Sequence, residues 1–130
     1  MVFSSMSLEL PGEQFVSAIA NRRNMTGIKK NEDFSRVYRR GTSKADHLLV
    51  LYRLDRGDSG DRRIGISVSK KTGNSVVRHR IKRRIKEIFR LNEGEFSTGC
   101  DYVAVARKGA ASADYREIAE SLIRLNSKFS

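Results

Sequence analysis

Apolar side chains recur at two different spacings along this 130-residue chain. In residues 77–90 they follow a helical spacing and fall within one arc of roughly 120°, which predicts an amphipathic helix packed on a core. The side chains in that arc are Val77, Ile81, Ile85, Ile88 and Phe89. Residues 63–69 instead alternate apolar and polar side chains, which predicts a strand with one buried face.

Local signals predict four further elements. A helix is expected between Asn31, which is a favourable N-cap residue, and Gly41, which is a typical helix stop. Acidic residues in its first turn also favour this helix. Residues 47–54 and 102–106 are rich in strand formers, which indicates two more strands. A partial apolar face indicates a last helix over residues 114–128.

These elements predict a small α+β sandwich, with three helices packed on a mainly antiparallel four-stranded sheet. Because only a short polar loop separates residues 47–54 from residues 63–69, we expect those two strands to pair antiparallel. A single domain is expected over residues 28–130. Residues 1–27 are predicted to be an N-terminal extension outside the domain, and a true start at Met25 is an alternative.

Composition adds a strong positive charge, with 26 Lys and Arg against 15 Asp and Glu and a net charge of +11. The excess is concentrated between Lys70 and Arg90, a segment with nine basic residues and one acid, Glu87. Like charges four residues apart repel along a helix, so this pattern is unusual for a merely solvated face. The chain is therefore predicted to bind a polyanion such as a nucleic acid.

The remaining chemistry argues against a protein catalyst. A single cysteine, Cys100, excludes an intramolecular disulfide, and two separated histidines offer no metal-hydrolase pattern. The acids are scattered, and the loop over residues 55–61 lacks the later Glu of a calcium loop. No apolar stretch approaches the ~18–20 residues of a membrane span, and no secretory signal is recognisable. We expect no catalytic residue, no metal bound by the protein alone and no membrane partner.

A family resemblance is strongest in residues 67–87, which read SVSKKTGNSVVRHRIKRRIKE and closely resemble the signature of the bacterial ribonuclease P protein subunit. The resemblance extends over residues 28–125, through KKNEDF near the start, GTS and VLY in the middle and DYVAVARK near the end. Where the family's helix motif is Arg-Asn-Arg, this chain has Arg78-His79-Arg80. This chain keeps both arginines. The sequence leaves open whether His79 makes the contact that asparagine makes in the family.

The resemblance implies a fold like the second domain of ribosomal protein S5, with a left-handed crossover between two parallel strands. General rules alone predict a right-handed crossover. The resemblance also implies a cytoplasmic ribonucleoprotein that removes the 5′ leader from precursor tRNA, in which the RNA subunit and its magnesium ions perform the hydrolysis. The expected partners are this catalytic RNA and precursor tRNA with its 5′ leader, with no obligate protein partner.

Two binding surfaces follow from the resemblance, and the first is the basic helix with its entry. We expect this surface to bind phosphate groups of the RNA subunit through its arginine and lysine side chains and through the N–H groups at the helix N-terminus. The residues are Lys70, Lys71, Asn74, Arg78, His79, Arg80, Lys82, Arg83, Arg84 and Lys86. Arg107 and Lys108 form another basic patch, whose partner the sequence does not name.

The second surface is a groove between the first helix and the sheet, which is expected to hold the single-stranded leader. Its residues are Phe34, Tyr38, Tyr52, Ser67 and Ser69. Aromatic rings suit this role because they stack on any base without selecting its identity. Phe and Tyr at helical spacing are also common core residues, so a packing role is the alternative. Tyr102 and Tyr115 are predicted to pack in the core.

Two other functions stay open at the level of sequence. A ribosomal protein or RNA chaperone would use the same basic helix, and it would bind precursor tRNA without regard to the leader. A protein-only nuclease would cleave precursor tRNA with magnesium and no added RNA. These two properties distinguish the alternatives.

Overall fold

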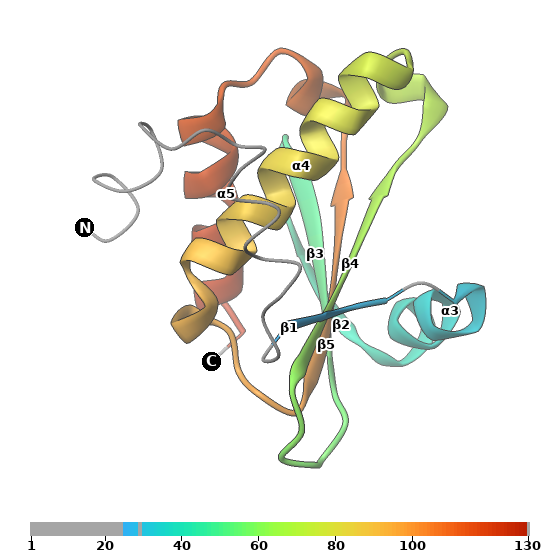
Figure 1. Cartoon of the computed structure of the whole chain (residues 1–130), viewed down its shortest axis with the longest axis vertical. Coiled ribbons are helices and arrows are strands. Elements are labelled where there is room, and N and C mark those ends of the chain that lie inside the picture. The colour runs from blue at the N-terminus through green and yellow to red at the C-terminus, as the bar shows by residue number, and fades with distance from the viewer. Residues whose placement is uncertain (1–24, 29, 130) are drawn as a thin grey trace.

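The structure, a computed structural model, describes residues 25–28 and 30–129 (Figure 1). The strands are β1 (Met25–Gly27), β2 (Thr42–Ala45), β3 (Leu49–Asp55), β4 (Arg62–Val68) and β5 (Cys100–Ala106). The α-helices are α3 (Asn31–Arg40), α4 (Ser75–Leu91) and α5 (Tyr115–Ser127). Short 3₁₀ helices are η2 (Lys70–Thr72), η3 (Glu93–Glu95) and η4 (Lys108–Ala111).

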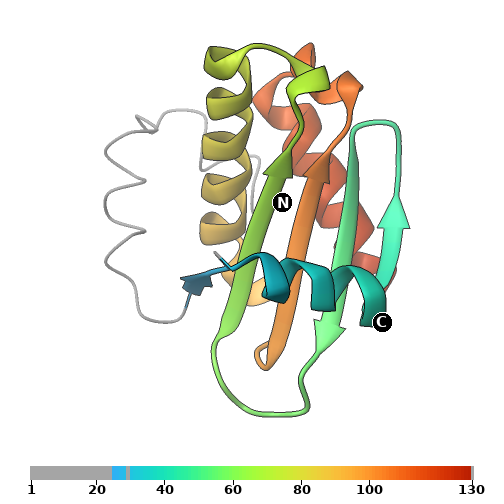
Figure 2. The ribbon, with the colours of Figure 1, turned by 90° about the vertical axis from the view of Figure 1, so that its right-hand side faces the viewer.

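The strands form one five-stranded sheet in the order β1-β4-β5-β3-β2. Helices α4 and α5 cover one face of the sheet, and α3 crosses the other (Figures 1 and 2). Among the four longer strands two of the three pairings are antiparallel, so the predicted α+β sandwich is confirmed. The short β1 pairs in parallel with β4, so Met25–Gly27, expected in the extension, belong to the sheet. The rest of the predicted extension lies outside the described residues.

The predicted antiparallel pairing between β3 and β4 is wrong, because β5 lies between them. β5 pairs antiparallel with β3 and parallel with β4. Apart from the buried Asp101 near its start, its side chains are apolar on both faces, with Tyr102 and Ala104 in the main core and Val103 and Val105 in a smaller cluster under α3. A strand of this kind is most stable at the centre of a sheet that is covered on both sides.

The connection from β4 through α4 to β5 is left-handed. In Figure 2, where α3 lies in front of the sheet, α4 lies behind it. β4 and β5 both point upward in that view, and β5 lies to the right of β4. Seen from the side of the helix, the second strand is therefore on the left. This is the form that the resemblance implied, against the common right-handed form.

The apolar arc predicted for α4 packs against the sheet as expected. Its buried members are Ile81, Ile85, Ile88 and Phe89, and Val77 packs against the edge of the same core. Tyr102 and Tyr115, predicted as packing residues, also contact this core. The opposite side of α4 is consequently left for the charged side chains.

Two residues near helix ends differ from prediction. Arg90, expected on the basic side of α4, is buried, because the chain turns at once into η3 and brings Glu93 Oε2 within 3.0 Å of Arg90 Nη1. Asn31, expected as the N-cap of α3, is its first residue, and Lys30 occupies the cap position without a side-chain hydrogen bond. The Lys30 carbonyl accepts the Phe34 N–H at 3.2 Å.

Candidate nucleic-acid interface

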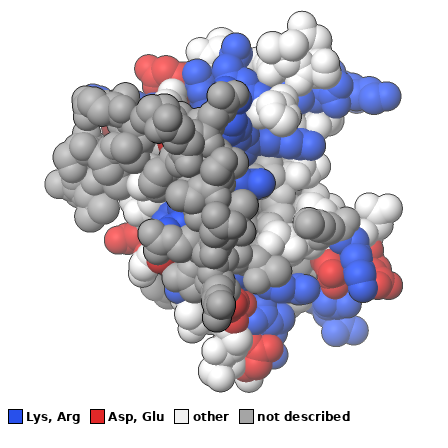
Figure 3. Space-filling view, viewed as in Figure 1, with Lys and Arg blue, Asp and Glu red and all other residues white. Residues whose placement is uncertain are grey.

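The outer side of α4 and the turn before it carry the basic residues predicted to bind RNA. Six of the predicted residues are exposed: Lys70, Lys71, Asn74, His79, Lys82 and Lys86. The other four are half-buried: Arg78, Arg80, Arg83 and Arg84. Figure 3 shows Lys and Arg side chains gathered around the end of the molecule where α4 begins, in the upper part of the view.

Two of these arginines are oriented by main-chain carbonyl groups. Arg78 Nε donates to the Gly73 carbonyl at 3.2 Å, and Arg84 Nη1 donates to the Ala113 carbonyl at 3.2 Å. Burial and the neighbouring Arg80 lower the pKa of the Arg84 guanidinium, as expected where positive charges crowd together. A guanidinium has five N–H donors, so one such bond fixes its direction and leaves donors for a phosphate.

Asn74 has a structural role at the start of α4. Its side-chain oxygen accepts the Val77 N–H at 3.0 Å and thereby caps the helix. The side chain is exposed, so its amide N–H₂ group still faces solvent at the positive end of the helix.

The Arg107-Lys108 patch lies beside Lys70 and Lys71. β4 and β5 are parallel neighbours with Val68 opposite Ala106, so the residues that follow both strands meet at one edge of the sheet. There η4 packs against η2 and against α4. We call Lys70, Lys71, Arg107 and Lys108 the basic rim. Sequence reasoning missed this grouping because its signal, the parallel pairing, is not local.

The aromatic residues predicted for the second surface lie together on the sheet face that α3 crosses, which we call the α3 face. The ring of Tyr38 meets that of Tyr52 edge-on, with centroids 4.9 Å apart and planes at 70°. Phe34 lies on the other side of Tyr38, at a centroid distance of 6.3 Å. Tyr38 is 39% exposed, whereas Phe34 and Tyr52 are half-buried. We call these three residues the aromatic strip.

The two predicted serines, Ser67 and Ser69, are not part of the aromatic strip. Ser67 is half-buried on β4 and pairs in register with Val105, on the α3 face. Figure 2 shows that α3 crosses only part of the strands on this face. Ser69 lies beyond the end of β4 and is the cap residue of η2, next to the basic rim.

Gly65 determines how closely α3 approaches the sheet. A Cβ atom at this position would lie 2.8 Å from Phe34 Cε1 and 3.2 Å from Ile28 Cβ. The phenyl ring therefore rests directly on the backbone of β4, which brings the aromatic strip close to the strands.

Replacement of Gly65 by alanine is expected to move Phe34 and to lower the free energy of unfolding by about 1–3 kcal/mol, because the added methyl group overpacks this contact. Denaturant unfolding and the near-ultraviolet circular dichroism of the aromatic strip measure the two effects. The matched control is Gly27→Ala in β1, where a Cβ would meet nothing within 4 Å. Equal stability of the Gly65 variant and the wild type, with unchanged aromatic signals, would contradict the prediction.

The acidic residues do not gather in one cluster in the part of the chain that the structure describes. No three His, Cys, Asp or Glu side chains converge there. In the loop over residues 55–61, Asp55 and Asp58 accept the N–H groups of Gly57 and Gly60, and Asp58 also binds Arg56. These carboxylates therefore hold the loop together. Within the same described ranges, no helix is long and apolar enough to cross a membrane.

Comparison with known proteins identifies the family. Residues 22–130 match the family model for ribonuclease P. A curated relative from Geobacillus kaustophilus, named ribonuclease P protein component, is 48% identical over 98 residues, which are 75% of this chain and 81% of the relative. A relative of the same name from Listeria monocytogenes is 47% identical over 98 residues, which are 75% of this chain and 82% of the relative. The chain belongs to the ribonuclease P protein family.

Solved structures of ribonuclease P proteins share its fold. The protein from Staphylococcus aureus matches with a TM-score of 0.74 at 36% identity, covering 80% of this chain and 94% of that one. The protein from Thermotoga maritima matches with a TM-score of 0.72 at 28% identity, covering 79% of this chain and 96% of that one. The resemblance seen in the sequence is confirmed. As a ribonuclease P protein component, the chain is a subunit of an endoribonuclease of tRNA processing and has an RNA partner.

His79 occupies the position where the ribonuclease P motif was expected to have asparagine. It is exposed in the second turn of α4, between the half-buried Arg78 and Arg80. A neutral imidazole can donate one hydrogen bond and accept another, and an amide can likewise donate and accept, but the two groups place these atoms at different distances from the backbone. The flanking arginines keep the positions that the motif predicts.

Proposed function

We propose that this ribonuclease P protein binds two RNA molecules on two different surfaces. The catalytic RNA subunit lies along α4 and the basic rim, and the single-stranded 5′ leader of precursor tRNA lies on the α3 face. The observation that carries the proposal is the aromatic strip, which presents an exposed Tyr38 on the sheet face opposite α4. The basic rim lies at the ends of β4 and β5, at one edge of the sheet whose two faces carry α4 and α3.

Electrostatic attraction provides most of the binding to the RNA subunit in this proposal. The exposed lysines of α4 carry their charge at the end of a flexible side chain. The planar guanidinium groups of Arg78 and Arg84 are instead oriented by hydrogen bonds to main-chain carbonyl groups. Displacement of counterions from RNA makes such binding strongly salt-dependent. If about six phosphates are neutralised, the affinity falls by several powers of ten between roughly 50 and 200 mM salt.

Stacking provides the binding of the leader. The exposed ring of Tyr38 is held by its edge-on contact with Tyr52. Phe34 extends the aromatic strip on the same helix. Each stacked base contributes ~1–3 kcal/mol without regard to its identity, which suits leaders of differing sequence. Ser67 and Ser69 add hydrogen-bonding groups toward the basic rim.

Hydrolysis is assigned to the RNA subunit, and this chain contributes no catalytic residue. Magnesium is assigned to the RNA subunit and the substrate, because Asp101 is engaged with two arginines and Asp55 and Asp58 accept main-chain N–H groups. The protein acts in the cytoplasm, positions RNA by charge and stacking, and requires no other protein.

The test is reconstitution with the cognate RNA subunit, followed by measurement of affinity for precursor tRNA and for the same tRNA without its leader. The wild type is expected to bind the leader-bearing form more tightly. Tyr38→Ala is expected to weaken that binding by roughly tenfold and to leave the leaderless form unaffected, because one stacking contact is lost. Tyr38→Phe keeps the ring and is expected to stay within about twofold of the wild type.

Two results would favour the other functions. Equal affinity for leader-bearing and leaderless tRNA in the wild-type holoenzyme would indicate a chaperone-like RNA binder. Cleavage of precursor tRNA by the purified chain with magnesium, and without added RNA, would establish a protein-only nuclease. Stimulation of the RNA subunit at low magnesium supports the proposal.

A further inference from the structure

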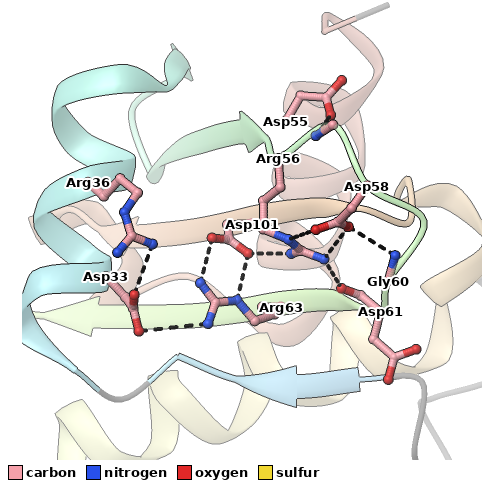
Figure 4. A network of polar contacts seen from close by, with 10 residues as sticks. Asp33, Arg36, Asp55, Arg56, Asp58, Gly60, Asp61, Arg63 and Asp101 are labelled. Atoms are coloured by element: carbon pink, nitrogen blue, oxygen red, sulfur yellow. Dashed lines mark hydrogen bonds and ion pairs between the residues drawn. The ribbon is translucent and has the colours of Figure 1, made fainter.

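A buried carboxylate lies at the centre of an ion-pair network on the α3 face (Figure 4). The side chain of Asp101 on β5 is fully buried. Arg63 on β4 binds it with two hydrogen bonds, Nε to Oδ1 at 2.8 Å and Nη2 to Oδ2 at 2.8 Å. Arg56 binds it from the loop between β3 and β4, with Nη1 2.6 Å from Oδ1.

The two arginines connect Asp101 to different parts of the molecule. Arg63 Nη1 lies 3.7 Å from Asp33 Oδ2, so Arg63 reaches the first turn of α3. Arg56 instead binds Asp58 at 3.0 Å and the Asp61 carbonyl at 2.7 Å, and both partners belong to its own loop. Removal of either arginine takes one guanidinium from the same carboxylate, but only Arg63 touches α3.

Helix α3 also packs on the sheet through a small apolar cluster. Val37 is its buried side chain, and Phe34 rests on Gly65, which lies two residues after Arg63 on the same face of β4. Asp33 directly precedes Phe34, and Tyr38 lies one turn further along the helix. The ion pair therefore acts on the turn of α3 that begins the aromatic strip.

We propose that Arg63 is a positioning residue for leader binding, which holds Asp33 of α3 against the buried Asp101 and thereby fixes Tyr38 over Tyr52. The inference rests on the proposed function of the α3 face. A guanidinium suits this role because its planar fork grips Asp101 with two donors and still presents a third to Asp33. A lysine has a single charged group and cannot span both carboxylates in the same way.

The experiment compares Arg63→Gln with the matched Arg56→Gln in holoenzymes reconstituted with the cognate RNA subunit. Affinity for precursor tRNA is measured with and without the leader, together with kcat and KM. We expect Arg63→Gln to weaken binding of the leader-bearing form by roughly fivefold to tenfold, since a displaced Tyr38 loses part of its stacking. Binding of the leaderless form and kcat at saturation are expected to stay as in the wild type. Arg56→Gln is expected to leave all four quantities unchanged.

A second variant tests the same link without touching Asp101. Asp33→Asn removes the charge at the α3 end of the ion pair and is expected to reproduce the leader-specific loss. Asp33→Asn also removes an ion pair with Arg36 inside α3. In the double variant with Arg63→Gln, the losses in leader affinity that come from the Arg63–Asp33 contact should not add, because either substitution alone removes that contact. Arg63→Lys should restore only part of the affinity.

The outcomes separate this inference from the proposed function. Equal losses in Arg63→Gln and Arg56→Gln, or no loss in Arg63→Gln and Asp33→Asn, would overturn the positioning role while wild-type leader dependence stood. Absence of leader dependence in the wild type would overturn the proposed function and this inference with it. A loss confined to the Arg63 and Asp33 variants supports both.

Discussion

Replacing Lys82 and Lys86 with glutamine is expected to weaken binding to the RNA subunit by roughly ten- to thirtyfold at about 0.15 M salt, through loss of two phosphate contacts. Both side chains are exposed on the outer side of α4, and glutamine keeps much of their length and helix propensity. The slope of log affinity against log salt concentration should become shallower by about 1.4–1.8, the value expected for two phosphates. Titrations at several salt concentrations measure both quantities.

The matched control is the double variant Lys44→Gln, Lys128→Gln. It changes the net charge of the chain by the same amount, but its residues lie on β2 and just after α5. If α4 contacts the RNA, the control should keep nearly the wild-type affinity and nearly the same slope of log affinity against log salt concentration. If both double variants lose the same affinity, the overall charge of the protein determines RNA binding and α4 is not the interface.

The helix α4 could be predicted from sequence because its signal is local. An apolar arc repeats over four turns, so the buried side and the charged side follow from the 3.6-residue period alone. Arg90 shows the limit of that argument. It has the right angular position for the basic side, but its environment is set by η3, which folds back beneath the end of the helix.

The order of the strands could not be predicted in the same way. A short polar loop between two strands usually means a hairpin, yet β5 enters between β3 and β4 from about thirty residues further along the chain. The available hint was the apolar run at 102–106, which suits a strand that is buried on both faces. The left-handed crossover came from the family resemblance, because the physical rule favours the opposite hand.

The candidate site was predicted in part. Phe34 and Tyr38 lie four residues apart on one helix, so their shared side follows from sequence. Placing Tyr52 beside them required the resemblance. The basic rim and the Asp101 network were missed, since they join segments that are far apart in the chain. Arg63 and Asp101 are separated by 38 residues, and no periodicity connects them. Asp33, Asp58 and Asp101, which are far apart in the sequence, each bind an arginine of this network.

The largest effect on stability is expected from Asp101→Asn, which should lower the free energy of unfolding by about 3–5 kcal/mol at pH 7, the usual cost of breaking a buried ion pair. The amide has nearly the same volume as the carboxylate, so packing is kept. It leaves Arg56 and Arg63, whose side chains are 19% and 27% exposed, facing each other without the negative charge that both bind. Urea denaturation measures the loss.

The control and the pH dependence make this prediction specific. Asp58→Asn removes a carboxylate that binds the same Arg56 but is 53% exposed, and a much smaller loss is expected. Burial alone would raise the pKa of Asp101, but its hydrogen bonds to Arg63 and Arg56 hold that pKa below its ordinary value. The folded state therefore keeps the charge at a lower pH than the unfolded state. This stabilisation is complete above about pH 4 and is lost as the pH falls further, so the difference between wild type and Asp101→Asn should shrink on acidification. A difference that stays constant from pH 7 to pH 3 would show that the charge of Asp101 does not stabilise the fold.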